Sequence, residues 1–143
     1  MNFKSFEEIE SWKKARVFNK LIYSISQQGA FSKDFDLIRQ IRRASVSISS
    51  NIAEGFERNT DKEFVYFLYV AKASAGEVRS QLYLANDLEY INNEDFIQLK
   101  NQVVEISRLI GGLIKYLKKE INLIKCRLLS LEFPTFRLLS FRL

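Results

Sequence analysis

The sequence predicts an all-α fold, an antiparallel up-down-up-down four-helix bundle, and three observations carry this prediction. The chain of 143 residues is 47% hydrophobic and 27% charged, which is enough apolar material for the core of one domain. It has only five Gly and one Pro, whereas sandwiches and barrels use many of these residues in their turns. Its apolar residues recur at alternating steps of three and four, the spacing of one helix face.

Capping and turn signals divide the chain into four predicted helices. Ser5 with Glu8, and Thr60 with Glu63, have the capping-box spacing of a hydroxyl residue followed three positions later by glutamate. Ser32 is predicted to cap the second helix. The turn signals are Gly29, which can take positive φ after a helix end, Gly55, and Asn92–Asn93 with Asp95. The predicted helices cover residues 5–28, 32–55, 60–90 and 92–124.

One apolar stripe on each helix is predicted to face the core. The stripe residues are Ile9, Trp12, Phe18, Leu21, Ile22, Ile25, Ile38, Ile41, Ser45, Ile48, Ile52, Phe64, Leu68, Ala71, Ala75, Val78, Leu82, Ala85, Phe96, Leu99, Val103, Ile106, Ile110, Leu113 and Leu117. Such spacing with short connections predicts antiparallel neighbours that cross at about 20°.

Clusters of small residues predict close helix packing. On the third helix these are Ala71, Ala73, Ala75 and Gly76. Gly111–Gly112 lies inside the fourth helix, where each glycine costs about 1 kcal/mol relative to alanine. A close helix approach or a local bend is one explanation of this pair, and a hinge is the other.

The predicted domains are a bundle over residues 1–124 and a C-terminal extension over residues 125–143. The extension contains Pro134 and two copies of Arg-Leu-Leu-Ser, at residues 127–130 and 137–140. It also carries +3 of the net charge of +5. A partly disordered segment, docking on the bundle or on another subunit, and a short adhesive strand pair all remain open.

Composition excludes several classes of enzyme. The chain has no His, so catalytic triads, cysteine–histidine pairs and histidine–metal sites are excluded. One cysteine, Cys126, permits neither an internal disulfide nor a cysteine zinc site. We therefore expect no catalytic residue, no cofactor and no metal. With no targeting or membrane-spanning segment visible, we expect a cytoplasmic protein with no membrane partner.

The second helix carries two polar stripes away from its isoleucines. Their members are Arg39, Arg43, Ser47, Ser50 and Glu54, and beside them Arg42, Ser49 and Ala53. Small residues let another helix approach closely, which predicts burial on more than one side or a partner there. Asn51, Glu54 and Glu77 are predicted to form a structural polar network. Arg58 is a candidate partner for Glu54, which lies at the unfavourable end of the helix dipole.

Nine basic residues are candidates for nucleic-acid binding: Arg39, Arg42, Arg43, Arg58, Lys62, Lys13, Lys14, Arg16 and Lys20. Arginine suits phosphate and carboxylate equally well, so Arg42 and Arg43 can instead pair with Glu54 or Glu77. A solvated face is the third alternative. No RNA-binding, zinc-finger or P-loop motif is present, so any binding would depend on shape and charge. The tyrosines at 66, 69, 83, 90 and 116 are interpreted as core or subunit interface rather than as stacking platforms.

Three stretches together resemble a known family. Residues 40–58 read QIRRASVSISSNIAEGFER, and EFVYFLYVAKASAGEVRSQL and NDLEYI follow them. The sequence resembles the four-helix-bundle proteins encoded by intervening sequences in bacterial 23S rRNA genes, which are similar to the accessory proteins of diversity-generating retroelements. The resemblance covers about residues 3–120 and implies a short bacterial protein, a ring-shaped homopentamer and no established enzymatic activity. For the retroelement branch it also implies binding to a reverse transcriptase and to nucleic acid.

The sequence thus predicts a non-enzymatic, homo-oligomeric adaptor that binds RNA, DNA or a nucleic-acid enzyme. A purely structural protein-interaction module is the alternative. An enzyme using Glu54, Glu77 and Arg43 is the least favoured hypothesis, because without His only an all-carboxylate Mg²⁺ or Mn²⁺ site remains.

Overall fold

The computed structural model describes residues 3–132 and is built from four α-helices. They are α1 (Glu10–Ile25), α2 (Phe35–Phe56), α3 (Asp61–Asp87) and α4 (Asn93–Glu132), and two short 3₁₀ turns, η1 (Phe6–Glu8) and η2 (Phe31–Lys33), precede α1 and α2. No strand occurs among these residues. The prediction of an all-helical fold with four helices is confirmed.

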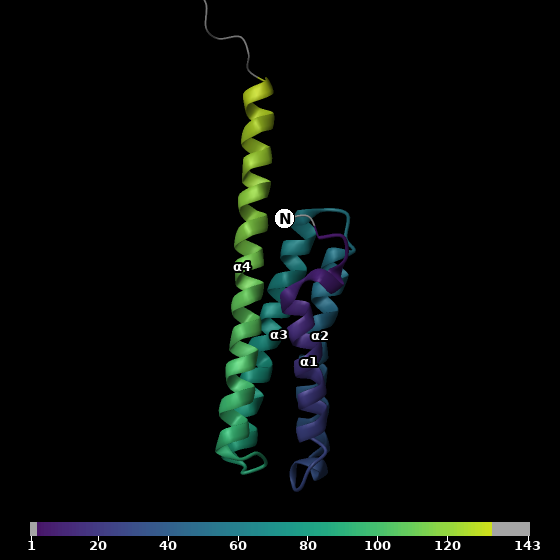
Figure 1. Cartoon of the computed structure of the whole chain (residues 1–143), viewed down its shortest axis with the longest axis vertical. Coiled ribbons are helices and arrows are strands. Elements are labelled where there is room, and N and C mark those ends of the chain that lie inside the picture. Colours follow the sequence, from purple (N-terminus) through teal and green to yellow (C-terminus); the bar gives the residue numbers. More distant parts are fainter. Residues whose placement is uncertain (1–2, 133–143) are drawn as a thin grey trace, which may run out of the picture.

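The four helices pack side by side, and α4 continues well past the end of the other three (Figure 1). Contacts between α1 and α2 pair rising residue numbers on one helix with falling numbers on the other. On α1 and α2, Asn19 bonds Ser49 while Ser26 bonds Arg42.

Helix caps follow the sequence signal at two predicted starts, Thr60 and Asn92, and depart from it at Ser5 and Ser32. Thr60 Oγ1 accepts a hydrogen bond from Glu63 N at 3.2 Å, so the cap predicted for α3 is confirmed. Ser5 makes no side-chain cap bond, and α1 begins later, at Glu10. The carboxylate of Glu8 accepts instead from Lys4 N at 2.9 Å, which holds the short turn η1.

The cap of α2 is Asp34 rather than Ser32. Asp34 Oδ1 accepts from Leu37 N at 3.0 Å, while Ser32 Oγ donates to the Gly29 carbonyl at 2.7 Å. A carboxylate is an equally good acceptor at a helix N-terminus and also complements the helix dipole. Gly29 has a φ of +49°, the left-handed conformation predicted for it.

The predicted stripes form the core of the bundle. Trp12, Leu21, Ile25 and Leu113 are only partly buried, and the rest of the predicted set is buried. On α4 the stripe predicts that Leu113 is buried, but the buried residue is its neighbour Ile114. A straight helix has 3.6 residues per turn and drifts away from a 3.5-residue repeat, which explains a shift of one position after three heptads.

Glycine marks one close contact between helices, at Gly55. A Cβ atom there would lie 2.6 Å from Phe67 Cβ and 2.9 Å from Phe64 Cδ2 on α3. A Cβ at Gly76 or Gly112 would meet nothing within 4 Å, and one at Gly111 only Lys72 Cε at 3.8 Å. The close approach predicted for Gly111–Gly112 is therefore absent within the described part of the chain.

Helix α4 crosses the predicted boundary at residue 124 without a break and ends at Glu132. The first Arg-Leu-Leu-Ser copy is thus helical, which argues against the strand pair. Residues 125–132 contain neither Gly nor Pro, so nothing local interrupts the helix. Pro134 and the second copy lie outside the described residues.

Candidate nucleic-acid interface

Two of the predicted arginines form ion pairs with carboxylates three or four residues earlier in the sequence. Arg58 Nη2 lies 2.6 Å from Glu54 Oε1, the pairing proposed from the helix dipole, and Arg39 pairs with Asp36. All four side chains are more than two-fifths exposed, so each pair contributes little stability. Each pair nevertheless reduces the positive charge available to a phosphate.

Two predicted lysines on α1 also contact carboxylates. Lys14 Nζ lies 3.3 Å from Glu105 on α4, and Lys13 Nζ lies 3.8 Å from Glu10. A surface groove between α1 and α4 includes all four side chains, so its charges are mixed. This face is a poor candidate for binding a polyanion.

Arg42 and Arg16 contact aromatic rings. The Arg42 guanidinium lies 4.6 Å from the Tyr23 ring centroid, and its Nε donates to Ser26 Oγ at 2.8 Å. It therefore joins α2 to the end of α1 rather than pairing with Glu54 or Glu77. Arg16 lies over the Trp12 ring at 5.8 Å.

Three of the nine candidates, Arg43, Lys20 and Lys62, are exposed and have neither an ion pair nor a ring contact among the residues that the structure describes. They lie on three different helices, α2, α1 and α3. The other six candidates contact carboxylates or aromatic rings of the same chain.

The predicted polar network consists of separate local bonds. Asn51 Nδ2 donates to the Ser47 carbonyl at 2.8 Å and to Ser47 Oγ at 2.9 Å. Glu77 accepts from Gln81 at 3.2 Å. Within residues 3–128 no hydrogen bond joins Asn51, Glu54 and Glu77 to one another.

Small polar residues of α2 instead join it to both neighbouring helices. Buried Ser45 donates to Asn19 Oδ1 on α1 at 2.6 Å, and Asn19 donates to Ser49 Oγ at 3.0 Å. On the other side, Ser47 and Ser74 on α3 lie within 2.9 Å. These contacts explain why α2 has two polar stripes of small residues.

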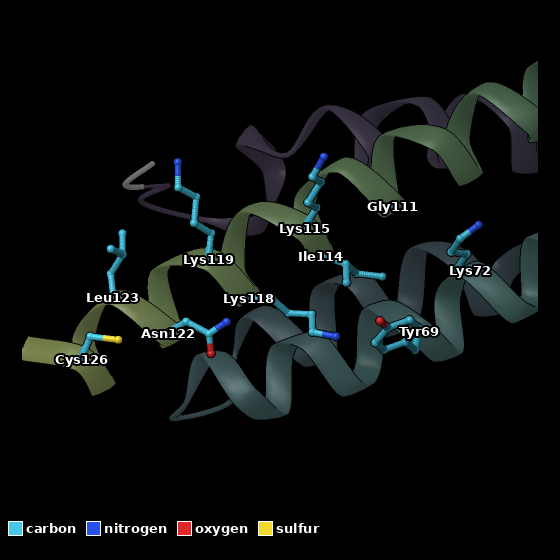
Figure 2. A pocket seen from close by; sticks show the side chains of 10 residues that line it. All are labelled: Tyr69, Lys72, Gly111, Ile114, Lys115, Lys118, Lys119, Asn122, Leu123 and Cys126. Carbon is cyan, nitrogen blue, oxygen red and sulfur yellow. The ribbon is translucent and has the colours of Figure 1, made fainter. Parts of the chain in front are cut away.

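A basic groove runs between α3 and the C-terminal half of α4 (Figure 2). It has a volume of about 650 Å³. Its lining residues are Tyr69, Lys72, Gly111, Ile114, Lys115, Lys118, Lys119, Asn122, Leu123 and Cys126. Four lysines and no acid line it, so it is the most strongly basic pocket described.

The side chains of this groove leave its positive charge largely unneutralised. Lys72 Nζ donates to Ser107 Oγ at 3.1 Å, and Lys118 Nζ lies 5.9 Å from the Tyr69 ring centroid. In Figure 2, Lys118 points toward α3, whereas Lys115 and Lys119 point away from it along the outer rim. None of the four lysines pairs with a carboxylate among residues 3–128.

Sequence reasoning missed all four of these lysines. The segment KYLKK at residues 115–119 places three lysines on one helix face, and this spacing was the available signal. Of the tyrosines interpreted as core or subunit interface, Tyr66, Tyr69 and Tyr83 are about half exposed or more and lie outside the core of this chain, so for them only the subunit interface stays a prediction.

Within residues 3–132, no three metal-ligating side chains gather in one place. No helix in that part of the chain is both long enough and apolar enough to cross a membrane.

The fold and the groove define this molecule as an all-helical, four-helix protein with a basic surface groove. The model of the 23S rRNA-intervening sequence protein family matches residues 7–112. The chain belongs to that family, as its resemblance predicted.

One similar solved structure is the crystal structure of a protein of unknown function from the S23 ribosomal protein family of Bacteroides thetaiotaomicron. It is 28% identical, with a TM-score of 0.69, and the match covers 73% of this chain and 95% of that one. The comparison with curated proteins gives no match. The similarity to retroelement accessory proteins stays a prediction.

Proposed function

We propose that this protein is a non-enzymatic, homo-oligomeric adaptor of the cytoplasm that binds nucleic acid, or a nucleic-acid enzyme such as a reverse transcriptase, through a basic surface. The proposal includes an up-down-up-down bundle and a ring-shaped homopentamer. The observation that supports it best is the groove between α3 and α4, where four lysines have no carboxylate partner in the described residues. Such cations attract phosphates without reading a base sequence.

Assembly of subunits into a ring would strengthen nucleic-acid binding by a groove of modest charge. A ring of identical subunits repeats the same groove, and simultaneous contacts raise the effective concentration of each one. Large apolar side chains such as Val17, Phe35 and Leu84 are exposed in the single chain, at 60%, 72% and 47%. A subunit interface would cover side chains of this kind.

The oligomeric part is tested by mass photometry or sedimentation at micromolar concentration. We expect a species of several subunits, with five as the specific expectation. A monomer under these conditions would contradict the ring.

The binding part is tested by titrating structured RNA and duplex DNA at a series of salt concentrations. We expect binding that weakens steeply as salt rises, because bound cations are released from the nucleic acid. Absence of binding to both probes at low ionic strength would rule out the nucleic-acid role.

A purely structural protein-interaction module is the second candidate. It is favoured by the six predicted cations that contact carboxylates or rings of their own chain. Capture of one protein partner that survives nuclease treatment would support it.

A further inference from the structure

The groove between α3 and α4 combines cations with an apolar floor. Lys115, Lys118 and Lys119 lie at its α4 side, while Ile114 and Leu123 supply apolar surface between and beside them. A simple anion needs only the cations. An apolar floor beneath a cationic rim favours a ligand that has both a flat apolar part and negative charge.

Tyr69 supplies a flat aromatic surface within the groove. Tyr69 is 48% exposed and lines the groove, and the Lys118 ammonium lies 5.9 Å from the centroid of its ring. An exposed tyrosine can stack on any base, because every base has an aromatic face. In a paired duplex the base faces are already stacked, so this ring favours an unpaired strand.

The basic face continues along α4 beyond the groove lysines. Lys125 follows Lys118 at the helical spacing of the same face. The span from Lys115 to Lys125 is about 15 Å at 1.5 Å per residue. A track of this length suits several linked phosphates better than one mononucleotide.

Most of the groove lies outside the region that defines the family. The family match ends at residue 112, whereas seven groove residues, from Ile114 to Cys126, come after it. Tyr69 and Lys72 are contributed by α3, inside the matched region. The groove therefore combines the shared bundle with a segment that the family model does not describe.

We infer that this groove binds an unpaired stretch of RNA or DNA, with the lysines contacting phosphates and Tyr69 stacking on a base. The inference rests on the proposed nucleic-acid role and assigns it to one site. The two polymers offer the same phosphates and base faces, so the probes in the test distinguish between them.

The first test removes the groove charges. A triple variant, Lys115→Gln, Lys118→Gln and Lys119→Gln, is compared with Lys4→Gln, Lys33→Gln and Arg79→Gln. Both variants lose three positive charges from residues without an ion pair in the described structure. The probes are a single-stranded RNA, a single-stranded DNA and a duplex of the same sequence.

We expect the groove variant to bind single strands about tenfold more weakly at moderate salt and its salt slope to fall by about two, since each phosphate contact contributes about 0.7. The salt slope of the control variant should differ from the wild-type slope by no more than about 0.5. Equal losses of affinity in the two variants would show that the groove is not the binding site, while leaving the proposed adaptor function intact. Wild-type protein that binds none of the probes would overturn the nucleic-acid role in the proposed function.

The second test removes the aromatic surface. Tyr69→Leu should weaken single-strand binding by about tenfold and duplex binding much less. Tyr66→Leu is the matched control, because Tyr66 lies on the same helix, is 64% exposed and does not line the groove. If Tyr69→Leu binds single strands as the wild type does, the stacking role is wrong.

The third test uses the one cysteine of the chain as a reporter in the unmodified protein. Cys126 is exposed and lines the groove at its far end. A saturating single-stranded oligonucleotide should slow its reaction with a thiol reagent several-fold, whereas an oligoglutamate of equal charge should not. An unchanged rate under saturating strand would place the binding site elsewhere, and equal protection by oligoglutamate would contradict the preference for nucleotides.

Discussion

The Tyr90 phenol donates a hydrogen bond to Asp34 Oδ2 at 3.2 Å, while the other oxygen of the same carboxylate accepts from Leu37 N at 3.0 Å. One side chain therefore caps α2 and also binds the segment that follows α3. The Tyr90 ring stacks on buried Phe31, with ring centroids 5.4 Å apart. Asp34 thus ties together two parts of the chain that are 56 residues apart in sequence.

Alkaline stability should depend on Tyr90. Desolvation, the hydrogen bond to Asp34 and the negative charge of that carboxylate all raise the pKa of the phenol. Because the folded pKa lies above the unfolded value of about 10, the stabilising contribution is present below that pH and is lost as pH rises through the folded pKa. Tyr90→Phe should therefore flatten the fall in unfolding free energy above about pH 10.

Urea denaturation between neutral and strongly alkaline pH measures this effect. Tyr66→Phe is a suitable control, since the exposed Tyr66 has no hydrogen bond to a carboxylate in the described structure. It should keep the wild-type pH profile. If Tyr90→Phe also keeps it, the Tyr90 phenol does not titrate with folding.

The cap of α2 can be identified by substitution. Asp34→Ala should lower the unfolding free energy by about 1 kcal/mol or more, because it removes the acceptor of Leu37 N together with the partner of Tyr90. Ser32→Ala should change it by less than about 0.5 kcal/mol, since Ser32 bonds only an exposed turn carbonyl. If chemical denaturation shows a larger loss of unfolding free energy for Ser32→Ala than for Asp34→Ala, the cap of α2 is Ser32.

Gly55 and Gly76 should respond oppositely to alanine. At Gly55 a new Cβ would lie 2.6 Å from Phe67 Cβ, so Gly55→Ala should cost about 1–3 kcal/mol through forced separation of α2 and α3. At Gly76 the same atom meets open space, and Gly76→Ala should stabilise the helix by about 0.5–1 kcal/mol. Thermal or urea unfolding of the two variants provides the measurement, and a neutral Gly55→Ala would contradict the close packing.

The hydrogen bond between Ser45 and Asn19 should contribute measurably to the free energy of unfolding. Ser45→Ala leaves the Asn19 carbonyl oxygen without its partner at a buried contact, which should cost about 1–2 kcal/mol. Ser50→Ala, on the exposed face of the same helix, is the control and should be neutral or slightly stabilising. Equal effects of the two substitutions on urea unfolding would show that the buried bond contributes nothing specific.

The core was predictable because helix periodicity depends on many residues at once. Buried residues such as Ile41, Ile48 and Leu82 belong to stripes of many apolar residues, so one wrongly assigned residue does not change the predicted buried face. Helix starts depend on one or two local bonds, so they were harder to predict. Ser5 and Ser32 are both residue types that cap helices. After Ser5 the helix begins later than predicted, and near Ser32 the carboxylate of Asp34 accepts the capping hydrogen bond instead.

The candidate site was largely unpredictable for a different reason. Whether a cation is free depends on carboxylates that tertiary packing brings close, as Glu105 of α4 is brought to Lys14 of α1. The local pairs Arg39 with Asp36 and Arg58 with Glu54 were visible in the sequence spacing. The groove requires Lys72 of α3 and Lys118 of α4 to line the same hollow, and no pattern within one helix indicates that.

The long last helix has a consequence for local unfolding. Leu117 is buried in the bundle and Ile121 packs against it, whereas every residue from 122 to 128 is exposed. Past Ile121 the backbone is held only by its own hydrogen bonds, and helical segments this short are marginal in water. Backbone amides of α4 near Ile110 should therefore exchange with deuterated solvent only on global opening, while those after residue 122 exchange orders of magnitude faster. One uninterrupted helix would thus contain both the slowest and the fastest helical amides of the described chain.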